Sequence, residues 1–489
     1  MNKPLRRIAI FCGLLILSLM IRDNWLQYVR ADELNANEHN RRVEIERFAH
    51  ERGNIITADG QTITGSTETS GNDFKYKRSW KDGPTWAPVT GYASQAFGAT
   101  QLENLEDGIL SGTDNRLFFD RTMSMFTGDK KKGGNVITTL NSKAQKAAFD
   151  GLGDKKGAVA AIDPRTGAIL ALASTPSYDP STFAGNTSKD SKAYNALQKK
   201  VDPDDPMLNR ALRQTYPPGS TFKVVTAAAA LENGLYSGID DPTKSPVPYI
   251  LPDTDHQPLN NEGNIPCENA TLKVALQWSC NTVFGKISAD LGNDKMKAEA
   301  EKFGFNKEIF NPVRTDASVY PKDNRPQNAM AGIGQASNRA TPLQMAMVAS
   351  AVANDGKLMK PYMVDQLQAP NVDVLSKTQP EQMSQPMSAA TAQKLQKMME
   401  FVVTDGTGKA GQINGMTVGG KTGTAQHGVG NKDNPYAWFI SYAKSGDGSP
   451  VAVAVVIEGS DTTRDDIAGG KLAAPIARDV MKAVLDGKK

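Results

Sequence analysis

The sequence is poor in the features that mark nucleic-acid-binding and metal-dependent proteins. Its 489 residues carry a formal net charge of only +3, and its aromatic and basic segment FKYKRSWK has a spacing that suits strands and turns better than a ligand site, so a nucleic-acid partner is not expected. Its four histidines show no metal-ligand spacing; they are His39, His50, His256 and His427. We therefore expect neither a metal nor a cofactor. No internal repeat of fixed period stands out either.

Long apolar runs are also scarce, and the prominent one lies at the N-terminus. Residues 8–21, IAIFCGLLILSLMI, follow three cations within the first seven residues. About fourteen such residues form roughly 21 Å of helix, which is short for a membrane span and close to a signal-peptide core. No small-x-small cleavage site follows, and Trp25 and Tyr28 suit a membrane interface. We predict an uncleaved signal anchor in residues 1–29, with the N-terminus in the cytoplasm and the remainder extracytoplasmic. A cleaved signal peptide is the alternative.

Cysteine is rare, with three in the whole chain. Cys12 lies in the apolar run and fits an apolar filler. Cys267 and Cys280 lie in the exported part, where a disulfide between them would close a loop of roughly a dozen residues. Such a bridge is worth about 3 kcal/mol in the chain-entropy model. Two small buried thiols are the alternative, and the sequence leaves both open.

The rest of the chain divides by its patterns into two parts. Residues 30–150 are polar and punctuated by glycine. There RGNIITADGQTIT predicts a strand, an Asp-Gly turn and a strand, and FKYKRSWKDGPTWAPVTGY has a spacing that suits strands and turns. In residues 151–489, GAVAAIDPRTGAILALAS predicts a hairpin, alanine-rich segments predict helices, and AWFISYA and VAVAVVIEG predict late strands. The last segment, APIARDVMKAVL, predicts an amphipathic helix. Together they predict a mixed α/β domain whose sheet joins the first and last parts of the chain.

The segment PPGSTFKVVTAAAALENG places Ser220 and Lys223 three residues apart at the start of an apolar helix. Two prolines and a glycine precede the serine and favour a chain break there. On a helix the two side chains share one face, with about 5–6 Å between their Cβ atoms. A serine hydroxyl becomes a nucleophile when a neighbouring base takes its proton, and a lysine can do so when desolvation keeps it neutral. The pattern therefore predicts an activated nucleophile with its base.

A serine and a lysine three residues apart often occur by chance. Ser441 and Lys444 repeat this spacing in SYAK, where no chain break precedes it and a strand end is the simpler interpretation. Two further motifs strengthen the case at Ser220. Ser279 and Asn281, in QWSCNTVFG, offer a hydroxyl for proton relay and a carboxamide for a substrate amide. The segment VGGKTGTAQ offers a cation, hydroxyls and glycines that let an extended substrate lie close; its residues are Lys421, Thr422, Gly423 and Thr424.

The three motifs, in this order and about 60 and about 140 residues apart, resemble those of the penicillin-binding proteins, the serine D,D-transpeptidases that cross-link peptidoglycan. GIGQASNRATPLQMA, NDGKLMKPY and the AWF after the third motif are also similar, so the resemblance covers roughly residues 135–489. RFAHERGNIITADG resembles the start of the non-catalytic domain of class B members. FKYKRSWKDGPTWAPVTGYASQAFGATQLE is similar to the penicillin-binding protein A subgroup of actinobacteria. The implied fold is a transpeptidase domain with an antiparallel sheet and a helical cluster, preceded by a β-rich domain.

The resemblance implies a role for each motif residue. Ser220 would attack the penultimate D-Ala carbonyl of a stem peptide, and Lys223 would accept its proton. Ser279, held by hydrogen bonds to lysines, would pass a proton to the leaving amine. The backbone N–H groups of Ser220 and Thr424 would form the oxyanion hole. The other motif residues would bind substrate: Asn281 its backbone, and Lys421, Thr422 and Thr424 its carboxylate. β-Lactams would acylate the same serine.

Several alternatives use related motifs. A class A β-lactamase needs a Glu-x-x-Leu-Asn segment between the second and third motifs, and none is present. The roughly 120 residues ahead of the transpeptidase region are too few for a glycosyltransferase domain. A D,D-carboxypeptidase with water as acceptor has the same motifs, and a division scaffold with a degenerate site is a further alternative. Expected partners are the cytoplasmic membrane, stem peptides ending in D-Ala-D-Ala, β-lactams and other wall-synthesis or division proteins.

Overall fold

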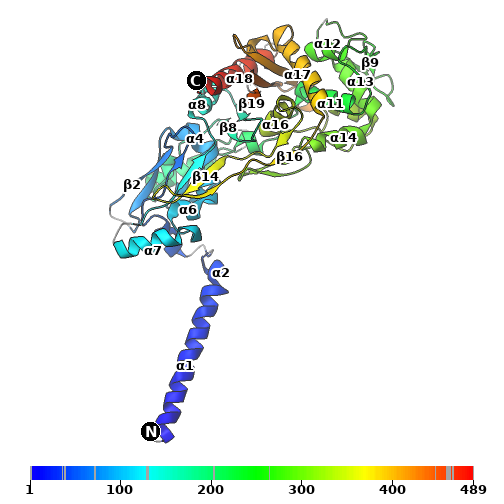
Figure 1. The fold of residues 1–489 in the computed structure, drawn as a ribbon. Coiled ribbons are helices and arrows are strands. Elements are labelled where there is room, and N and C mark those ends of the chain that lie inside the picture. Colours follow the sequence, from blue (N-terminus) through cyan, green and yellow to red (C-terminus); the bar gives the residue numbers. More distant parts are fainter. Residues whose placement is uncertain are drawn as a thin grey trace.

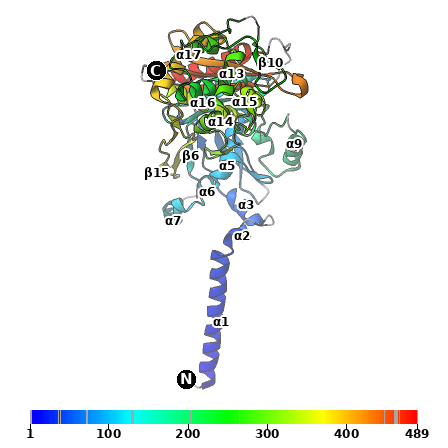
Figure 2. The same cartoon turned by 90° about the vertical axis from the view of Figure 1, so that its right-hand side faces the viewer.

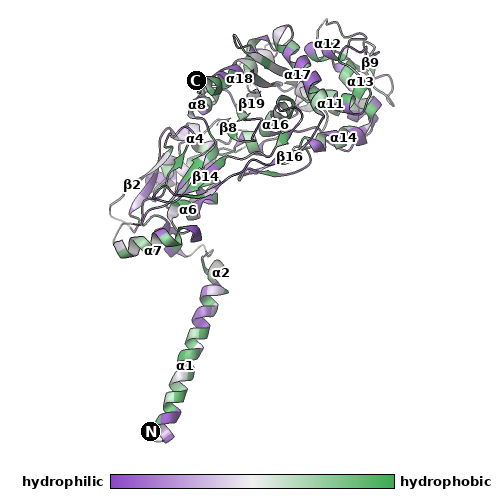
Figure 3. Cartoon of the chain, in the orientation of Figure 1, coloured by the Kyte–Doolittle hydropathy of each residue, from purple (hydrophilic) through white to green (hydrophobic). Residues whose placement is uncertain are grey.

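A computed structural model describes residues 3–35, 37, 40–70, 73–127, 131–201, 204–263, 265–446, 448–458, 464 and 467–487; His39 lies outside these residues. The first element is the helix α1 (Lys3–Tyr28), which projects away from the rest of the molecule and is apolar along its middle (Figures 1–3). At 26 residues it is about 39 Å long, enough to cross a bilayer, and its apolar side chains are exposed. The helix therefore extends well beyond the apolar run at residues 8–21 and indicates a single-pass anchor.

Residues 31–138 form short helices and strands at the end of the folded part from which α1 leaves (Figure 1). The expected strand and turn at RGNIITADGQTIT are present, but the second half of FKYKRSWKDGPTWAPVTGY is a helix rather than strands and turns. Pro84 stands in its first turn, where a missing N–H costs nothing, and burial of Trp86 and Val89 stabilises it. The elements are α2 (Ala31–Asn35), α3 (Arg41–Arg47), β1 (Ile55–Ile56), β2 (Thr64–Glu68), β3 (Tyr76–Trp80), α4 (Gly83–Thr90), β4 (Ala93–Ser94), β5 (Gly98–Ala99), α5 (Gln101–Leu105), α6 (Asp107–Ser111), η1 (Asn115–Leu117), α7 (Phe118–Thr127) and β6 (Asn135–Thr138).

The described part of residues 30–150 thus contains more helix than strand. The expectation of a β-rich domain is wrong in this detail, whereas the mixed α/β class of the chain is confirmed. The prediction failed because these helices are only one to three turns long. A pattern of 3.6-residue period cannot be recognised over so few residues.

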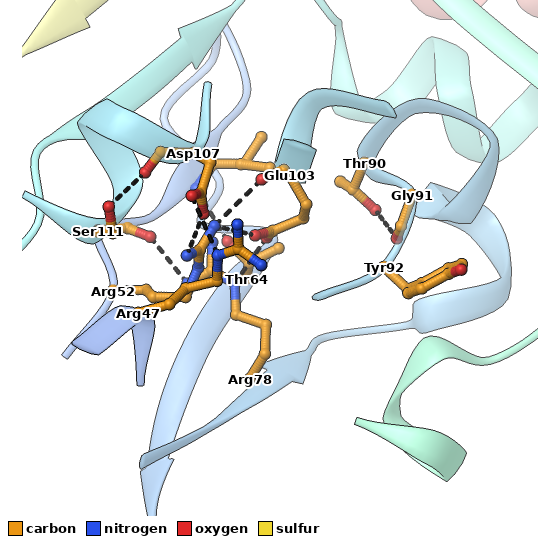
Figure 4. Close-up of polar contacts among 12 residues, drawn as sticks. Arg47, Arg52, Thr64, Arg78, Thr90, Gly91, Tyr92, Glu103, Asp107 and Ser111 are labelled. Carbon is orange, nitrogen blue, oxygen red and sulfur yellow. Dashed lines mark hydrogen bonds and ion pairs between the residues drawn. The ribbon is translucent and has the colours of Figure 1, made fainter. Parts of the chain in front are cut away.

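A buried ion-pair cluster holds this region together (Figure 4). The Glu103 carboxylate on α5 accepts from Arg52 at 3.0 Å and from Arg78 on β3 at 2.6 Å, and all three side chains are almost completely buried. Arg52 also pairs with Asp107 at 2.6 Å, and Arg47 on α3 reaches the other oxygen of Asp107 at 3.0 Å. Burial lowers the pKa of Arg78 to about 10, although Glu103 partly opposes the shift. The cluster ties β3, α3, α5 and α6 to one another.

A five-stranded antiparallel sheet forms the centre of the C-terminal part, in the order β17-β18-β19-β7-β8. The first two strands in sequence, β7 (Gly157–Ile162) and β8 (Ile169–Thr175), form the predicted hairpin. The other three come from the end of the chain: β17 (Thr417–Ala425), β18 (Tyr436–Ser445) and β19 (Gly448–Ile457). The prediction that one sheet joins the two ends of this region is confirmed.

Both faces of the sheet are covered by helices. The predicted helices α8 (Ser142–Leu152), capped by Asn141, and α18 (Gly469–Asp486) pack on one face, where Val453 and Val455 point. The apolar helix α16 (Pro342–Ala353) packs on the other, against Ala454 and Val456. Successive residues of a strand point to opposite faces, so a strand covered on both sides is apolar throughout. This accounts for the unbroken run VAVAVVI.

A cluster of helices lies next to α16, at the free edge of β17. Smaller elements make up the rest of the chain. The cluster holds η3 (Gly219–Phe222), α11 (Lys223–Glu232), α12 (Leu272–Gln277), α13 (Asn281–Leu291), α14 (Asn293–Lys302), α15 (Arg325–Ala331) and α17 (Ala389–Thr404). The remaining elements are η2 (Pro180–Phe183), α9 (Ser188–Gln198), α10 (Arg210–Arg213), β9 (Tyr249–Ile250), β10 (Pro258–Leu259), β11 (Ile309–Phe310), β12 (Arg314–Thr315), β13 (Leu358–Met359), β14 (Val364–Gln368), β15 (Val374–Lys377), β16 (Gln382–Ser384), η4 (Lys409–Gly411) and η5 (Val429–Asn431).

A second, four-stranded sheet links the two halves of the molecule. Its order is β1-β6-β14-β15, so strands from residues 55–138 pair with strands from residues 364–377. In Figure 1, β14 accordingly lies among the elements of the N-terminal region. The two halves are therefore joined by a hydrogen-bonded ladder as well as by the chain itself.

Candidate active site

Ser220 lies on a tight turn that leads directly into α11. The turn is the 3₁₀ segment η3, and Lys223 is the first residue of the α-helix that follows. Gly219 adopts φ +53°, a conformation that favours glycine, and its N–H donates to Gly334 O at 2.9 Å. The Trp438 indole donates to Pro217 O at 3.0 Å and holds the preceding segment against β18. Ser220 is half-buried, whereas Lys223 is fully buried.

The second motif lies at the junction of α12 and α13. Ser279 has φ +62°, which is unusual for a residue with a side chain. The Cys280 N–H donates to Ala275 O at 2.8 Å, closing α12 around this turn. Cys280 is joined to Cys267 by a disulfide with a Cα–Cα distance of 5.6 Å, and both residues are buried. Backbone strain of this kind is found at functional sites when surrounding contacts hold it in place.

The Lys223 amine connects the first motif to the second. It donates to Ser279 O at 2.7 Å, to Ser279 Oγ at 3.2 Å and to Asn281 Oδ1 at 2.6 Å. These contacts use all three donors of an ammonium group, so they bind Lys223 to Ser279 and Asn281 rather than to Ser220. The partnership with Ser220 rests on their shared position, one turn apart on the same segment. Catalytic hydrogen bonds often tighten only when substrate binds.

Lys421 brings the third motif to the same serine. It lies in β17, fully buried, and donates to Ser279 Oγ at 2.9 Å and to Thr422 O at 2.8 Å. Residues from three distant parts of the sequence, Lys223, Ser279 and Lys421, therefore meet at one hydroxyl. The resemblance implied that lysines hold Ser279 by hydrogen bonds, and Lys223 and Lys421 make these contacts here.

The two buried lysines have lowered pKa values. Burial lowers the pKa of Lys421 to about 7, and Glu262 raises it in part. Burial, followed by the positive charge of Lys421, holds the pKa of Lys223 well below its ordinary value, again with Glu262 opposing. Lys223 therefore loses its proton more readily than an exposed lysine, and one of its three donor contacts is given up when it does. A neutral amine beside the turn that presents Ser220 is what general-base chemistry requires.

The remaining residues of the third motif lie along the edge of the sheet beside η3. A side chain at Gly423 would approach Thr221 to 3.0 Å and Pro218 O to 3.2 Å, so these neighbours would have to shift to make room for it. The Thr422 hydroxyl shares a hydrogen bond of 2.6 Å with Thr407, and Thr424 is half-buried. Because β17 is an edge strand, half of its backbone polar groups point away from the sheet. An extended peptide can pair with such an edge.

Three residues near the site carried no motif signal. The Asn281 amide donates to Asn260 O at 3.1 Å, and the Asn261 side chain bonds both the N–H and the hydroxyl of Thr282 at the start of α13. Glu262 follows on the same loop and is the carboxylate that acts on both lysines. Nothing in this polar stretch distinguishes these residues from an ordinary surface loop, and only the fold brings them to Ser279.

The second Ser-x-x-Lys pair, at residues 441–444, and His427 after the third motif make ordinary local contacts. Ser441 is buried within β18 and Lys444 pairs with Glu400 at 2.6 Å, as expected for a strand end. His427 stacks on Tyr436 with ring centroids 4.0 Å apart and is half-buried. Within the described ranges no group of three or more His, Cys, Asp or Glu residues could hold a metal ion.

Comparison with known proteins finds similar proteins along the whole chain. Residues 157–482 match a model of the penicillin binding protein transpeptidase domain, and residues 52–136 match one of the penicillin binding protein A dimerisation domain. A curated relative, the peptidoglycan D,D-transpeptidase PbpA of Mycolicibacterium smegmatis, is 39% identical over 99% of both chains. The protein of the same name in Mycobacterium tuberculosis is 38% identical over 100% of both.

Solved structures also resemble this fold. The acyl-enzyme complex of penicillin-binding protein A from M. tuberculosis with ceftriaxone has a TM-score of 0.84 and 36% identity, covering 90% of this chain and 100% of that one. The complex of the same protein with penicillin G has a TM-score of 0.82 and 38% identity, covering 89% and 100%. A transpeptidase model over most of the chain and relatives of this identity over its full length show that the chain belongs to the penicillin-binding protein family.

Proposed function

We propose that this protein is a peptidoglycan D,D-transpeptidase that cross-links stem peptides through an acyl-serine intermediate and is inhibited covalently by β-lactams. The observation that carries the proposal is the meeting of Lys223 and Lys421 at the hydroxyl of Ser279, beside the turn that presents Ser220. Two further findings support it. The full-length relatives carry this activity in their names, and the M. tuberculosis structures hold ceftriaxone and penicillin G as acyl-enzymes.

The acylation step follows from the placement of these groups. Neutral Lys223 takes the proton of Ser220, and the serine oxygen attacks the penultimate D-Ala carbonyl of a stem peptide. The negative charge of the tetrahedral intermediate would be held by the backbone N–H groups of Ser220 and Thr424; the backbone of Thr424 passes so near that a side chain on Gly219 would lie 3.0 Å from Thr424 O. Preorganised donors of this kind lower an acyl-transfer barrier by several kcal/mol.

Ser279 then serves the leaving group. Its hydroxyl contacts both lysines, so it can pass a proton from Lys223 to the amine of the departing D-Ala while Lys421 holds its oxygen in position. An amine from a neighbouring strand next attacks the acyl-serine, and the same groups act in reverse to restore Ser220. Neither step consumes a cofactor.

The remaining motif residues bind substrate in this proposal. Thr422 and Thr424 offer hydroxyls to the terminal carboxylate, and the positive charge of Lys421 attracts the same carboxylate. Gly423 lets the peptide backbone lie close to β17. Asn281 offers its amide to the substrate backbone: its Oδ1 accepts from Lys223 and one N–H donates to Asn260 O, while an amide has a second N–H that can bind substrate.

The proposal extends to organisation and location. Residues 1–29 anchor the chain with the N-terminus in the cytoplasm, residues 30–150 form a non-catalytic stalk and docking domain, and residues 151–489 form the transpeptidase domain outside the membrane. Cations within the first seven residues favour this orientation. We further propose that the protein acts in wall synthesis during division, together with other envelope proteins.

A labelling experiment separates the candidate functions. The full chain in detergent is incubated with a fluorescent penicillin, and wild type is compared with Ser220→Ala and with the matched control Ser441→Ala. We expect stable labelling of wild type and control and none of Ser220→Ala. Rapid loss of label from the wild type would indicate a β-lactamase, and absence of label a scaffold. Product analysis with a stem peptide and an amine acceptor then separates cross-linking from hydrolysis by a carboxypeptidase.

A further inference from the structure

The short helix α7 presents an unusually apolar face to the outside of the molecule. Its sequence is FFDRTMSMFT, and Phe118, Phe119, Met123 and Phe126 are 59%, 80%, 61% and 84% exposed. At 100° per residue these four side chains fall within about 140° of one another, on a single face. Large apolar residues scattered singly over a surface are ordinary, whereas a continuous face of this kind marks an interaction site.

Two hydroxyl groups on this helix already have hydrogen bonds within the helix. Thr122 falls between Phe118 and Phe126 on the same face, and its hydroxyl donates to Phe118 O at 2.8 Å within the helix. The Thr127 hydroxyl donates in the same way to Met123 O at 3.1 Å. A hydroxyl satisfied by its own helix loses little when water is removed. The sequence of the segment also has no net charge.

The beginning of the helix is fixed to the protein. Leu117, the last residue of η1, is buried in the main hydrophobic core and joins α7 directly. Phe118, Phe119, Met123 and Phe126 belong to none of the hydrophobic clusters of the described chain. Core packing therefore sets the direction of the helix without covering its apolar face.

The position of α7 indicates what covers it. In Figures 1 and 2, α7 lies at the end of the folded part from which α1 leaves, and in Figure 1 its axis runs across the direction of α1. Residues 29–40 separate the end of the anchor from α3, which lies at the same end. With α1 along the bilayer normal, α7 lies nearly in the plane of the membrane. This is the orientation of an interfacial helix whose apolar face enters the boundary between headgroups and acyl chains.

We propose that α7 is a second, peripheral membrane contact, in which Phe118, Phe119, Met123 and Phe126 insert into the surface of the bilayer that α1 spans. The occupant of the apolar face is lipid, and because the segment has no net charge the contact does not depend on anionic headgroups. The inference rests on the membrane anchor and is independent of the reaction at Ser220. Its consequence is that two points of attachment restrict how the folded part tilts.

The test uses the full chain reconstituted in phosphatidylcholine vesicles. In a Cys12→Ser background a thiol-reactive fluorophore is attached at Phe119→Cys or, as a matched control, at Gln393→Cys on α17, which is exposed and lies far from α1 in Figure 1. Phosphatidylcholine carrying a quencher near the headgroup is then included. We expect several-fold stronger quenching at position 119 than at position 393, and a marked loss of this difference when Met123→Ser and Phe126→Ser are added.

Each alternative has its own readout. Equal quenching at the two positions overturns the proposal. Weak quenching at position 119 together with oxidative cross-linking of two copies through this position also overturns it, and assigns the face to a second copy of the chain. Fluorescent penicillin labelling of every variant shows that the protein is folded. Loss of labelling in the wild type with lipid quenching intact would refute the proposed reaction and leave the membrane contact standing.

Discussion

In the proposed mechanism the charge of Lys421 sets the pH range in which Lys223 is a base, and replacing Lys421 by methionine tests this. Both amine nitrogens contact Ser279 Oγ, at 3.2 and 2.9 Å, so they lie no more than about 6 Å apart. At an effective dielectric constant of about 20, two like charges at this distance repel by about 2.8 kcal/mol, which equals about two pKa units. Lys421→Met removes this repulsion and raises the pKa of Lys223.

The sign of the effect follows from the role of Lys223. As a base it is active when neutral, so acylation slows as the pH falls through its pKa in the folded protein. Lys421, with its pKa lowered to about 7, is charged below neutrality and exerts its effect there. The acid limb of the rate profile should therefore lie about two pH units higher in Lys421→Met. At a fixed pH on that limb, acylation should fall by about 100-fold, in addition to a pH-independent loss from the broken bond to Ser279.

The assay is the second-order rate constant for acylation by a fluorescent penicillin, measured from about pH 5 to 10. Lys421→Arg keeps the charge and should leave the acid limb at or below its wild-type position. Lys444→Met, a lysine on the neighbouring strand paired with Glu400, should change nothing. If Lys421→Met lowers the rate by the same factor at every pH, the lysine acts only through its hydrogen bonds, and the electrostatic reasoning is refuted.

Three further outcomes are expected. Glu262→Gln should move the same acid limb downward, by less than a pH unit because Glu262 is exposed and screened, and added salt should abolish the shift. Glu103→Gln should lower the unfolding free energy by about 3–5 kcal/mol in urea because it removes the carboxylate paired with the buried Arg78 and leaves the buried Arg52 with Asp107 alone, whereas Asp107→Asn, at a partly exposed carboxylate, should cost less; equal losses would contradict this account. Opening the disulfide by Cys267→Ser should lower the stability by about 3 kcal/mol and slow acylation without moving the pH profile, and an unchanged rate would show that the bridge does not hold Ser279.

The central sheet could be predicted from the sequence because its pattern is strong. An apolar run long enough for a strand and bounded by turn residues, such as VAVAVVI in β19, has few other interpretations. The motif residues could be identified for a different reason. Their identities and order resemble a known family, although periodicity alone would have left Ser220 and Lys223 as a helix start. The resemblance also implied that lysines hold Ser279, but it did not give the contacts themselves, because those between residues 223, 279 and 421 depend on the whole fold.

Other features could not be predicted from the sequence because they depend on tertiary contacts. The helix α4 contains Pro88 in its interior, which argues locally against a helix, yet burial of Trp86 compensates for it. Glu262 stands in a polar loop without distinguishing neighbours, and only the packing of that loop on α13 gives it an electrostatic effect. The apolar residues of α7 were visible in the sequence, but the same pattern describes a helix buried in a core. The structure shows this face uncovered.

The way the two halves are joined bears on how the enzyme reaches its substrate. The helix α7 follows Leu117 in the main core, and the sheet β1-β6-β14-β15 links residues 55–138 to residues 364–377 by backbone hydrogen bonds. The buried cluster around Glu103 adds charge-assisted bonds between the elements next to α7 (Figure 4). A ladder and a buried ion-pair cluster resist bending far more than a single linker does. If α1 and α7 both hold the membrane end, as proposed above, this rigid connection restricts the distance of Ser220 from the bilayer.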